Sequence, residues 1–157
     1  MRCNYNPIQK ALAALLCALL LMAFLPLRGG AAEDAAALFA RAAEGGLTGG
    51  NDAAGSAPAD WYAFLAGTLG CPFDRAGYLA ALRGHLDALG RKGGLEKTRA
   101  TELQRIALAV YALGGDPTSF GSAKANLLAL GVYARDDLKE QGVNALIWGL
   151  LALDACG

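Results

Sequence analysis

Apolar and polar residues follow one another along this chain in blocks that distinguish two kinds of helix. Apolar side chains predominate in three segments: 58–69, 101–113 and 143–153. A helix that is apolar on all sides is normally surrounded by protein, so these segments predict three buried helices. They end alike, at Leu69, Leu113 and Leu153, and the intervals of 44 and 40 residues indicate a helical repeat.

The segment 73–89 has a different pattern. Four leucines fall on one stripe at helical spacing: Leu79, Leu82, Leu86 and Leu89. Charged residues lie off this stripe, which predicts an amphipathic helix with one solvent-exposed side. We expect it to end at Gly90.

Two further segments complete the pattern. A short helix is expected at 122–130, and 131–141 reads as a charged connection. Buried and amphipathic helices therefore alternate with a period near forty residues, as two concentric helical layers require. An up-and-down bundle, the alternative, would show a similar stripe on every helix. The sequence predicts an all-α fold of about three helical hairpins with alternating outer and inner helices.

The helix at 101–113 carries its own boundary signals. Thr101 with Gln104 forms a capping-box pattern, and Thr98 is a competing cap. Two glycines and Pro117 end the helix. Arg105 is a charged residue on a buried helix, and we expect it to pair with an acid, Glu102 being the nearest choice.

The first residues have the organisation of a secretory signal peptide. Arg2 and Lys10 precede an apolar run from Ala11 to Leu25, and small residues near Ala32 offer a cleavage site. We therefore expect a signal peptide at 1–32 and a domain at 33–157, with a secreted or extracytoplasmic cell-surface location. The apolar run is short for a membrane span, and an uncleaved anchor is the alternative. In either case membrane contact is expected only through this segment.

Export affects the interpretation of the cysteines. Cys71 and Cys156 remain in the predicted mature chain, each just past the end of an equivalent helix. Packed helices lie about 8–10 Å apart, beyond the roughly 7 Å between Cα atoms that a disulfide spans. We expect two free thiols.

Several of these segments together resemble a known superfamily. They are RIALAVYALGGDP at 105–117, NLLALG at 126–131, QGVNALIWGLLALDA at 141–155, and the Asp60-Trp61 pair. This ordered set, over residues 58–157, is similar to the bacterial branch of the terpenoid cyclase and protein prenyltransferase superfamily. The resemblance implies an α/α toroid whose inner ring surrounds a cavity. It does not imply one function, because cyclases, prenyltransferase β subunits, cobalamin carriers and complement thioester domains share the fold.

The chain supplies only part of such a toroid. It ends just after an inner helix, before the outer helix that should cover it, which would expose four residues: Ile147, Leu150, Leu151 and Leu153. Soluble monomers rarely expose such a patch. We therefore expect either that the chain is a fragment of a longer protein or that association, for example as a homodimer, completes it.

The residues that suggest chemistry do not form a full set. In the superfamily, prenyltransferase β subunits bind zinc through an Asp-x-Cys pair and a distant His, which Asp154 and Cys156 match. The only histidine is His85, on the predicted outer helix, where it should not face the cavity. Two ligands do not make a zinc site, so we predict no metal and no cofactor.

Two other features have a structural interpretation. The acidic run at 136–140 contains Lys139 and follows Arg135, which predicts a solvated loop and not a magnesium site. The squalene-cyclase acid motif and the thioester motif are absent. Four aromatic residues on the predicted inner helices are expected to fill the core rather than to stabilise carbocations: Trp61, Tyr62, Tyr111 and Trp148.

These observations favour a non-catalytic function. Lys plus Arg and Asp plus Glu number 14 each, so no basic face predicts nucleic-acid binding. The leading hypothesis is an exported helical module that binds a small apolar ligand or a protein partner at the cell surface. The alternatives are an isoprenoid-processing enzyme, of the terpene cyclase or prenyltransferase type, and an inactive gene fragment.

Overall fold

A computed structural model of the chain describes residues 37–38 and 50–156. The predicted signal peptide at 1–32 lies outside these residues. Helices account for the regular structure: η1 (Asn51–Ala53), α3 (Ala57–Leu69), α4 (Arg75–Gly93), η2 (Leu95–Lys97), α5 (Ala100–Ala112), η3 (Ala129–Tyr133) and α6 (Val143–Cys156). Across 50–156 one isolated antiparallel bridge, Phe120 with Ala125, is the only extended pairing. The all-α prediction is confirmed.

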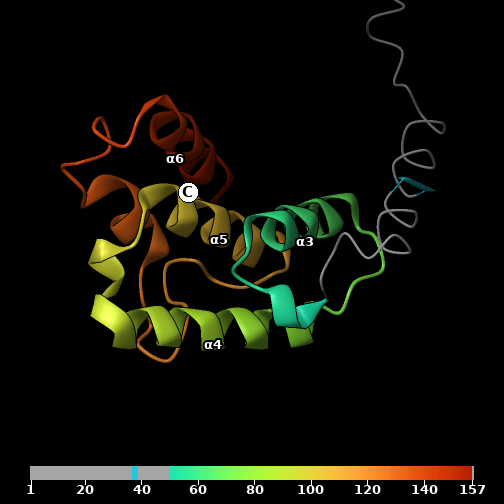
Figure 1. The fold of residues 1–157 in the computed structure, drawn as a ribbon. Coiled ribbons are helices and arrows are strands. Elements are labelled where there is room, and N and C mark those ends of the chain that lie inside the picture. Colours follow the sequence, from blue (N-terminus) through green and yellow to red (C-terminus); the bar gives the residue numbers. More distant parts are fainter. Residues whose placement is uncertain (1–36, 39–49, 157) are drawn as a thin grey trace, which may run out of the picture. The chain divides into compact units, whose positions relative to one another are not determined.

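Helix α5 is the centre of the arrangement. It packs against α3 along one side and against α6 and η3 along another, while α4 crosses on the far side (Figure 1). Its fully buried residues include Leu103, Ile106 and Leu108, and they join one cluster with Tyr78 and Leu82 of α4. The predicted burial of α5 is confirmed for eight of its 13 residues, whereas Tyr111 is exposed, and α5 contacts both α3 and α6. Their closure into a toroid stays a prediction.

Three predicted helix boundaries are wrong, and one of them is the end of α6, which runs to Cys156 instead of Leu153. Helix α4 continues through Gly90 to Gly93, because Arg91 and Lys92 extend its last turn, where basic side chains interact favourably with the helix dipole. The chain leaves the helix only at Gly94, whose φ is 89°.

The helix expected at 122–130 starts later than predicted. Residues 121–124 form a turn, in which the Asp87 carboxylate accepts hydrogen bonds from the amide and the hydroxyl of Ser122. Helical structure runs from 127 to 133 and includes the π-helical turn η3. Asn126 begins it, since its Oδ1 accepts a hydrogen bond of 2.9 Å from the Ala129 amide.

The helix 58–69 is less buried than its sequence predicts. Ala59, Ala63 and Ala66 face the core, but Leu65 and Leu69 are exposed. The buried residues of α3 are small because α3 approaches α5 closely: a Cβ added at Gly67 would overlap the backbone carbonyl of Ala112 on α5.

Among the described helices, none has the length and apolar character that a membrane span requires.

Candidate functional site

The most unusual surface of the described chain is one side of α6. Five apolar residues of this helix are exposed: Val143, Leu146, Ile147, Leu150 and Leu151. We call these five residues the α6 face. The prediction that Ile147, Leu150 and Leu151 are exposed is confirmed, whereas Leu153 is half-buried.

The opposite side of α6 explains how the helix is held. Ala145, Gly149 and Ala152 are its buried residues, at a spacing that places them on one stripe against α5. Small side chains let the two helices approach closely, and a Cβ added at Gly149 would lie 3.1 Å from Nε2 of Gln104. The bulky residues of α6 are therefore left on the outer side.

A groove runs beside the α6 face. It has a volume of about 310 Å³ and is lined by Val132, Leu138, Ala145, Leu146, Gly149 and Leu150. These six residues have no polar side-chain atom, so the groove can contribute apolar contact but no side-chain hydrogen bond. Binding sites usually combine an apolar lining with a few polar groups, and this groove has only the first of these features.

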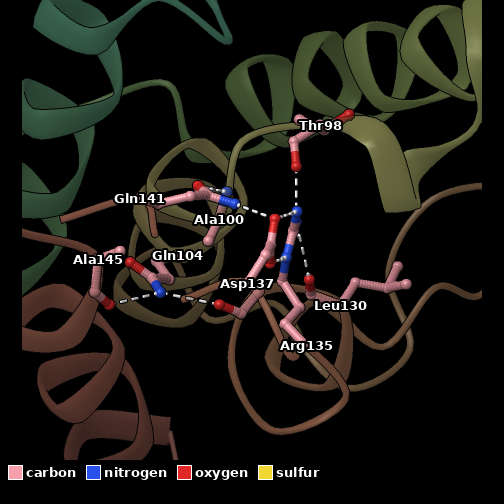
Figure 2. Close-up of polar contacts among 9 residues, drawn as sticks. Thr98, Ala100, Gln104, Leu130, Arg135, Asp137, Gln141 and Ala145 are labelled. Carbon is pink, nitrogen blue, oxygen red and sulfur yellow. Dashed lines mark hydrogen bonds and ion pairs between the residues drawn. The ribbon is translucent and has the colours of Figure 1, made fainter. Parts of the chain in front are cut away.

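Gln104 of α5 holds η3 and α6, the two elements next to this groove, through hydrogen bonds to their backbone. Its side chain is fully buried, and Nε2 donates to the carbonyl of Gly131 at 2.8 Å and to that of Ala145 at 2.9 Å (Figure 2). One side chain therefore links α5 to both η3 and α6. Oε1 of Gln104 has no hydrogen-bond partner within the described part of the chain. The predicted capping box is wrong, because Gln104 serves this contact and not the start of α5.

The start of α5 is capped from a distant loop. Oε1 of Gln141 accepts a hydrogen bond of 2.8 Å from the amide of Ala100, and Nε2 of Gln141 donates to Asp137 at 2.7 Å. Arg135 also donates to both Asp137 oxygens, at 2.8 and 3.0 Å, and to the carbonyl of Thr98 at 2.6 Å (Figure 2). The side-chain hydrogen bond from Arg135 is the main reason that the pKa of Asp137 falls to about 2. Within the acidic run, Asp137 thus anchors the segment that leads into α6.

A second polar cluster lies between α3, α4 and α5. Asp60 is fully buried, and its Oδ1 accepts from the Tyr78 hydroxyl at 2.7 Å and from the Gly55 amide at 2.9 Å. Its Oδ2 forms an ion pair with Nε of Arg105 at 2.9 Å. The expected pairing of Arg105 with Glu102 is wrong, since Glu102 contacts His85 at 3.2 Å instead. Burial, followed by the hydrogen bond to Asp60, raises the pKa of Tyr78.

The two metal candidates lie in the last turn of α6. Asp154 is exposed, and Cys156 is half-buried against the core cluster. Burial raises the pKa of the Cys156 thiol, which opposes the thiolate that zinc binds. Within the described residues, no three His, Cys, Asp or Glu side chains come close enough to hold a metal ion. His85 is remote in the fold, where it packs between Gly55 and Glu102.

The two cysteines form no disulfide, and the two tryptophans pack against each other. Cys71 and Cys156 are free thiols, as predicted. Trp61 of α3 packs on Trp148 of α6 with ring centroids 4.6 Å apart, and both are half-buried. Tyr111 is exposed, so its expected role in core packing is wrong.

The sequence alone did not predict the partners of two buried polar residues, Asp60 and Gln104, of which Gln104 contacts α6. Asp60 was noted only as the residue before Trp61, and Gln104 only as a capping residue. A detectable signal existed, since a polar residue in the middle of an otherwise buried helix needs a partner. The identity of that partner depends on tertiary contacts across 27 to 45 residues of sequence. Comparisons with protein-family models, curated proteins and solved structures found no match, so the superfamily resemblance stays a prediction.

Proposed function

We propose that this chain is an exported, non-catalytic helical module that binds an apolar partner at the cell surface through the α6 face. The observation that carries the proposal is the exposure of five large apolar side chains on one helix. Contiguous apolar patches of this kind mark interaction sites on soluble proteins. The adjoining groove adds concave apolar surface to the same site.

Three carboxylates that already form hydrogen bonds within the fold support a binding role over catalysis. Asp60, Asp87 and Asp137 use their carboxylates in hydrogen bonds that hold one segment of the fold to another. General acid–base catalysis needs a titratable group that can reach the proton of a substrate. The groove beside α6 is lined by no titratable side chain.

The export part of the proposal rests on the sequence. The charged start, apolar run and small residues before Glu33 are those of a signal peptide. Mass spectrometry of the protein recovered outside the cytoplasm of an expressing bacterium tests this part. A mature N-terminus near residue 33 is expected, and an unprocessed N-terminus in the cytoplasm would contradict export.

Binding of an apolar dye tests the α6 face directly. At a concentration at which the protein is monomeric, we expect 1-anilinonaphthalene-8-sulfonate to bind saturably and to change the fluorescence of Trp148, which lies on α6. Leu150→Glu places a charge at a position with an exposed fraction of 70% and should abolish this binding. Leu65→Glu, on an exposed leucine of α3, is the matched control and should leave it unchanged. Equal binding by both variants would contradict the proposal.

A further inference from the structure

The chemistry of the α6 face restricts the kind of partner that fits it. From Val143 to Leu153 the helix carries no ionisable side chain, and Asn144 is its only polar one. Non-obligate interfaces between two different proteins are about as polar as the rest of the protein surface. Homodimer interfaces are more apolar, and their core has few charged residues. The α6 face therefore has the composition of a homodimer interface.

The two ends of α6 carry opposite and unsatisfied electrostatic features. Asp154 is exposed at the C-terminal end, where the negative end of the helix dipole disfavours an anion, and no described residue forms an ion pair with it. At the other end, the amides of Val143 and Asn144 have no hydrogen-bond acceptor within residues 50–156, and the first turn has no acidic residue. The N-terminal end of α6, where the helix dipole favours an anion, has no acidic side chain in its first turn. The C-terminal end, where the dipole disfavours an anion, carries Asp154.

A second copy of the helix resolves both features at once. In an antiparallel pair, Asp154 of each copy lies beside the N-terminal turn of the other, because the 14 residues of α6 span about 21 Å and both groups lie near the ends. A parallel pair would instead bring the two Asp154 carboxylates together. The antiparallel pair has a two-fold axis, so the same residues contact each other from both sides.

The groove fits the same arrangement. Two helices pack about 8–10 Å apart by inserting the side chains of one into the depressions of the other. The small residues Ala145 and Gly149 form part of the groove wall, while Leu146 and Leu150 project beside it. Each copy thus offers both a depression and the aliphatic side chains that can enter one.

We propose that the partner of the α6 face is a second copy of this chain, bound through an antiparallel α6–α6 contact about a two-fold axis. This inference rests on the proposed function, since it names the partner of the same face. A ligand or a different protein on this face is an alternative outcome of the test.

Sedimentation equilibrium of the purified 157-residue chain, without detergent and over a range of concentrations, tests the contact. The wild type is expected to form a dimer, and Leu150→Glu should raise the dissociation constant at least about tenfold. Ile147→Lys is a second variant at an exposed position, in case the first one impairs folding. The control Leu65→Glu should dimerise like the wild type.

A charge variant tests the antiparallel orientation. Asn144→Lys places a cation where the partner's Asp154 is expected, and it should tighten the dimer about two- to fivefold. The gain should disappear in the Asn144→Lys/Asp154→Asn double variant. A weaker dimer with Asn144→Lys would overturn the antiparallel contact, because it would indicate that like ends meet.

The outcomes separate this inference from the proposed function. A wild type that stays monomeric at every concentration overturns the second copy as partner, as does a dimer that persists with Leu150→Glu and Ile147→Lys. If such a protein still binds the dye in a manner sensitive to Leu150→Glu, the proposed function stands. If the monomer does not bind the dye, both proposals fail.

Discussion

Helices α5 and α6 look alike in sequence, and their surroundings in the fold are opposite. Eight of the 13 residues of α5 are buried, but only three of the 14 residues of α6 are, so α5 is covered by other parts of the fold far more completely than α6. Yet α5 is the more polar helix, with Glu102, Gln104 and Arg105 in its first half. Hydropathy therefore ranks the two helices in the reverse order of their burial.

The difference lies in what the polar residues do. Gln104 and Arg105 connect α5 to three other parts of the fold: Gln104 reaches η3 and α6, and Arg105 reaches Asp60 of α3. Helix α6 has no such inward-facing polar residue, and it relies on small side chains against α5. Apolar sequence alone thus predicts that α6 is a helix, but it does not predict that the helix has a neighbour on every side.

The largest expected effect comes from the ion pair that anchors α5 to α3. Asp60→Ala leaves Arg105 largely buried without its partner and should lower the free energy of unfolding by about 3–5 kcal/mol. Urea denaturation followed by circular dichroism measures this change. The double variant Asp60→Ala/Arg105→Met should lose less than the two single losses combined. Additive losses would show that the two side chains are not coupled.

Truncation of one leucine in each helix measures the contrast directly. Leu108→Ala on α5 removes a fully buried side chain and should cost about 2–5 kcal/mol. Leu150→Ala on α6 removes an exposed one and should change the stability of the monomer by less than about 0.5 kcal/mol. The same denaturation experiment serves both variants. Similar losses at the two positions would mean that α6 is covered in solution.

Two helical glycines test how closely α3 approaches α5. Gly67→Ala forces a Cβ against the Ala112 carbonyl and should destabilise the fold by about 1–3 kcal/mol. Gly84→Ala, on the exposed side of α4 with no neighbouring atom, should stabilise it by about 0.5–1 kcal/mol. Thermal denaturation should therefore shift in opposite directions, and a shared sign would argue against the close contact.

The sequence was sufficient to predict where most helices lie, but it was insufficient to predict which distant residues their polar side chains contact. The leucine stripe of α4 and the apolar run of α5 from Ile106 to Ala112 predicted an all-α fold, because helical periodicity is a local property. The end of α4 was misplaced, since Gly90 does not by itself stop a helix whose next residues are basic. Ser122 was assigned to a helix, although its side chain contacts Asp87 across 35 residues of sequence.

The sequence predicted which residues of the candidate site are exposed, but it did not predict the contacts that hold the site in place. Exposure of Ile147, Leu150 and Leu151 was expected from the resemblance to a toroid, in which an outer helix should cover this inner helix, and not from a local pattern. The contacts of Gln104 did not follow, because its predicted partner was the start of its own helix and its observed partners lie 27 and 41 residues away. Gln141 caps the start of α5 from 41 residues away, and no signal in the sequence predicts this contact. Long polar side chains are poorly predicted in this way, since many backbone groups can accept or donate the same hydrogen bonds.

The smallest expected effect concerns the loop that leads into α6. The folded-state pKa of Asp137, about 2, lies below its ordinary value of 3.8, so its carboxylate stabilises the fold above a pH of about 4. This contribution should disappear as the pH falls toward 2. Denaturation between pH 7 and pH 2 should therefore show that Asp137→Asn is less stable than the wild type only at the higher pH.

Asp136 provides the control for that loop. It is exposed, and no hydrogen bond connects its side chain to another described residue. Asp136→Asn should leave the pH dependence of stability unchanged. If both variants follow the wild type between pH 4 and pH 2, the contact of Asp137 with Arg135 does not form in solution.

Hydroxyl-radical footprinting tests the contrast between the two helices most directly. The protein is labelled at a concentration at which sedimentation shows a monomer, and oxidation is measured on peptides from α5 and α6. We predict strong labelling of Ile147 and Leu150, and protection of Ile106 and Leu108, which are fully buried. Equal protection of the leucines in both helices would contradict the account, because it would show that another part of the chain covers α6.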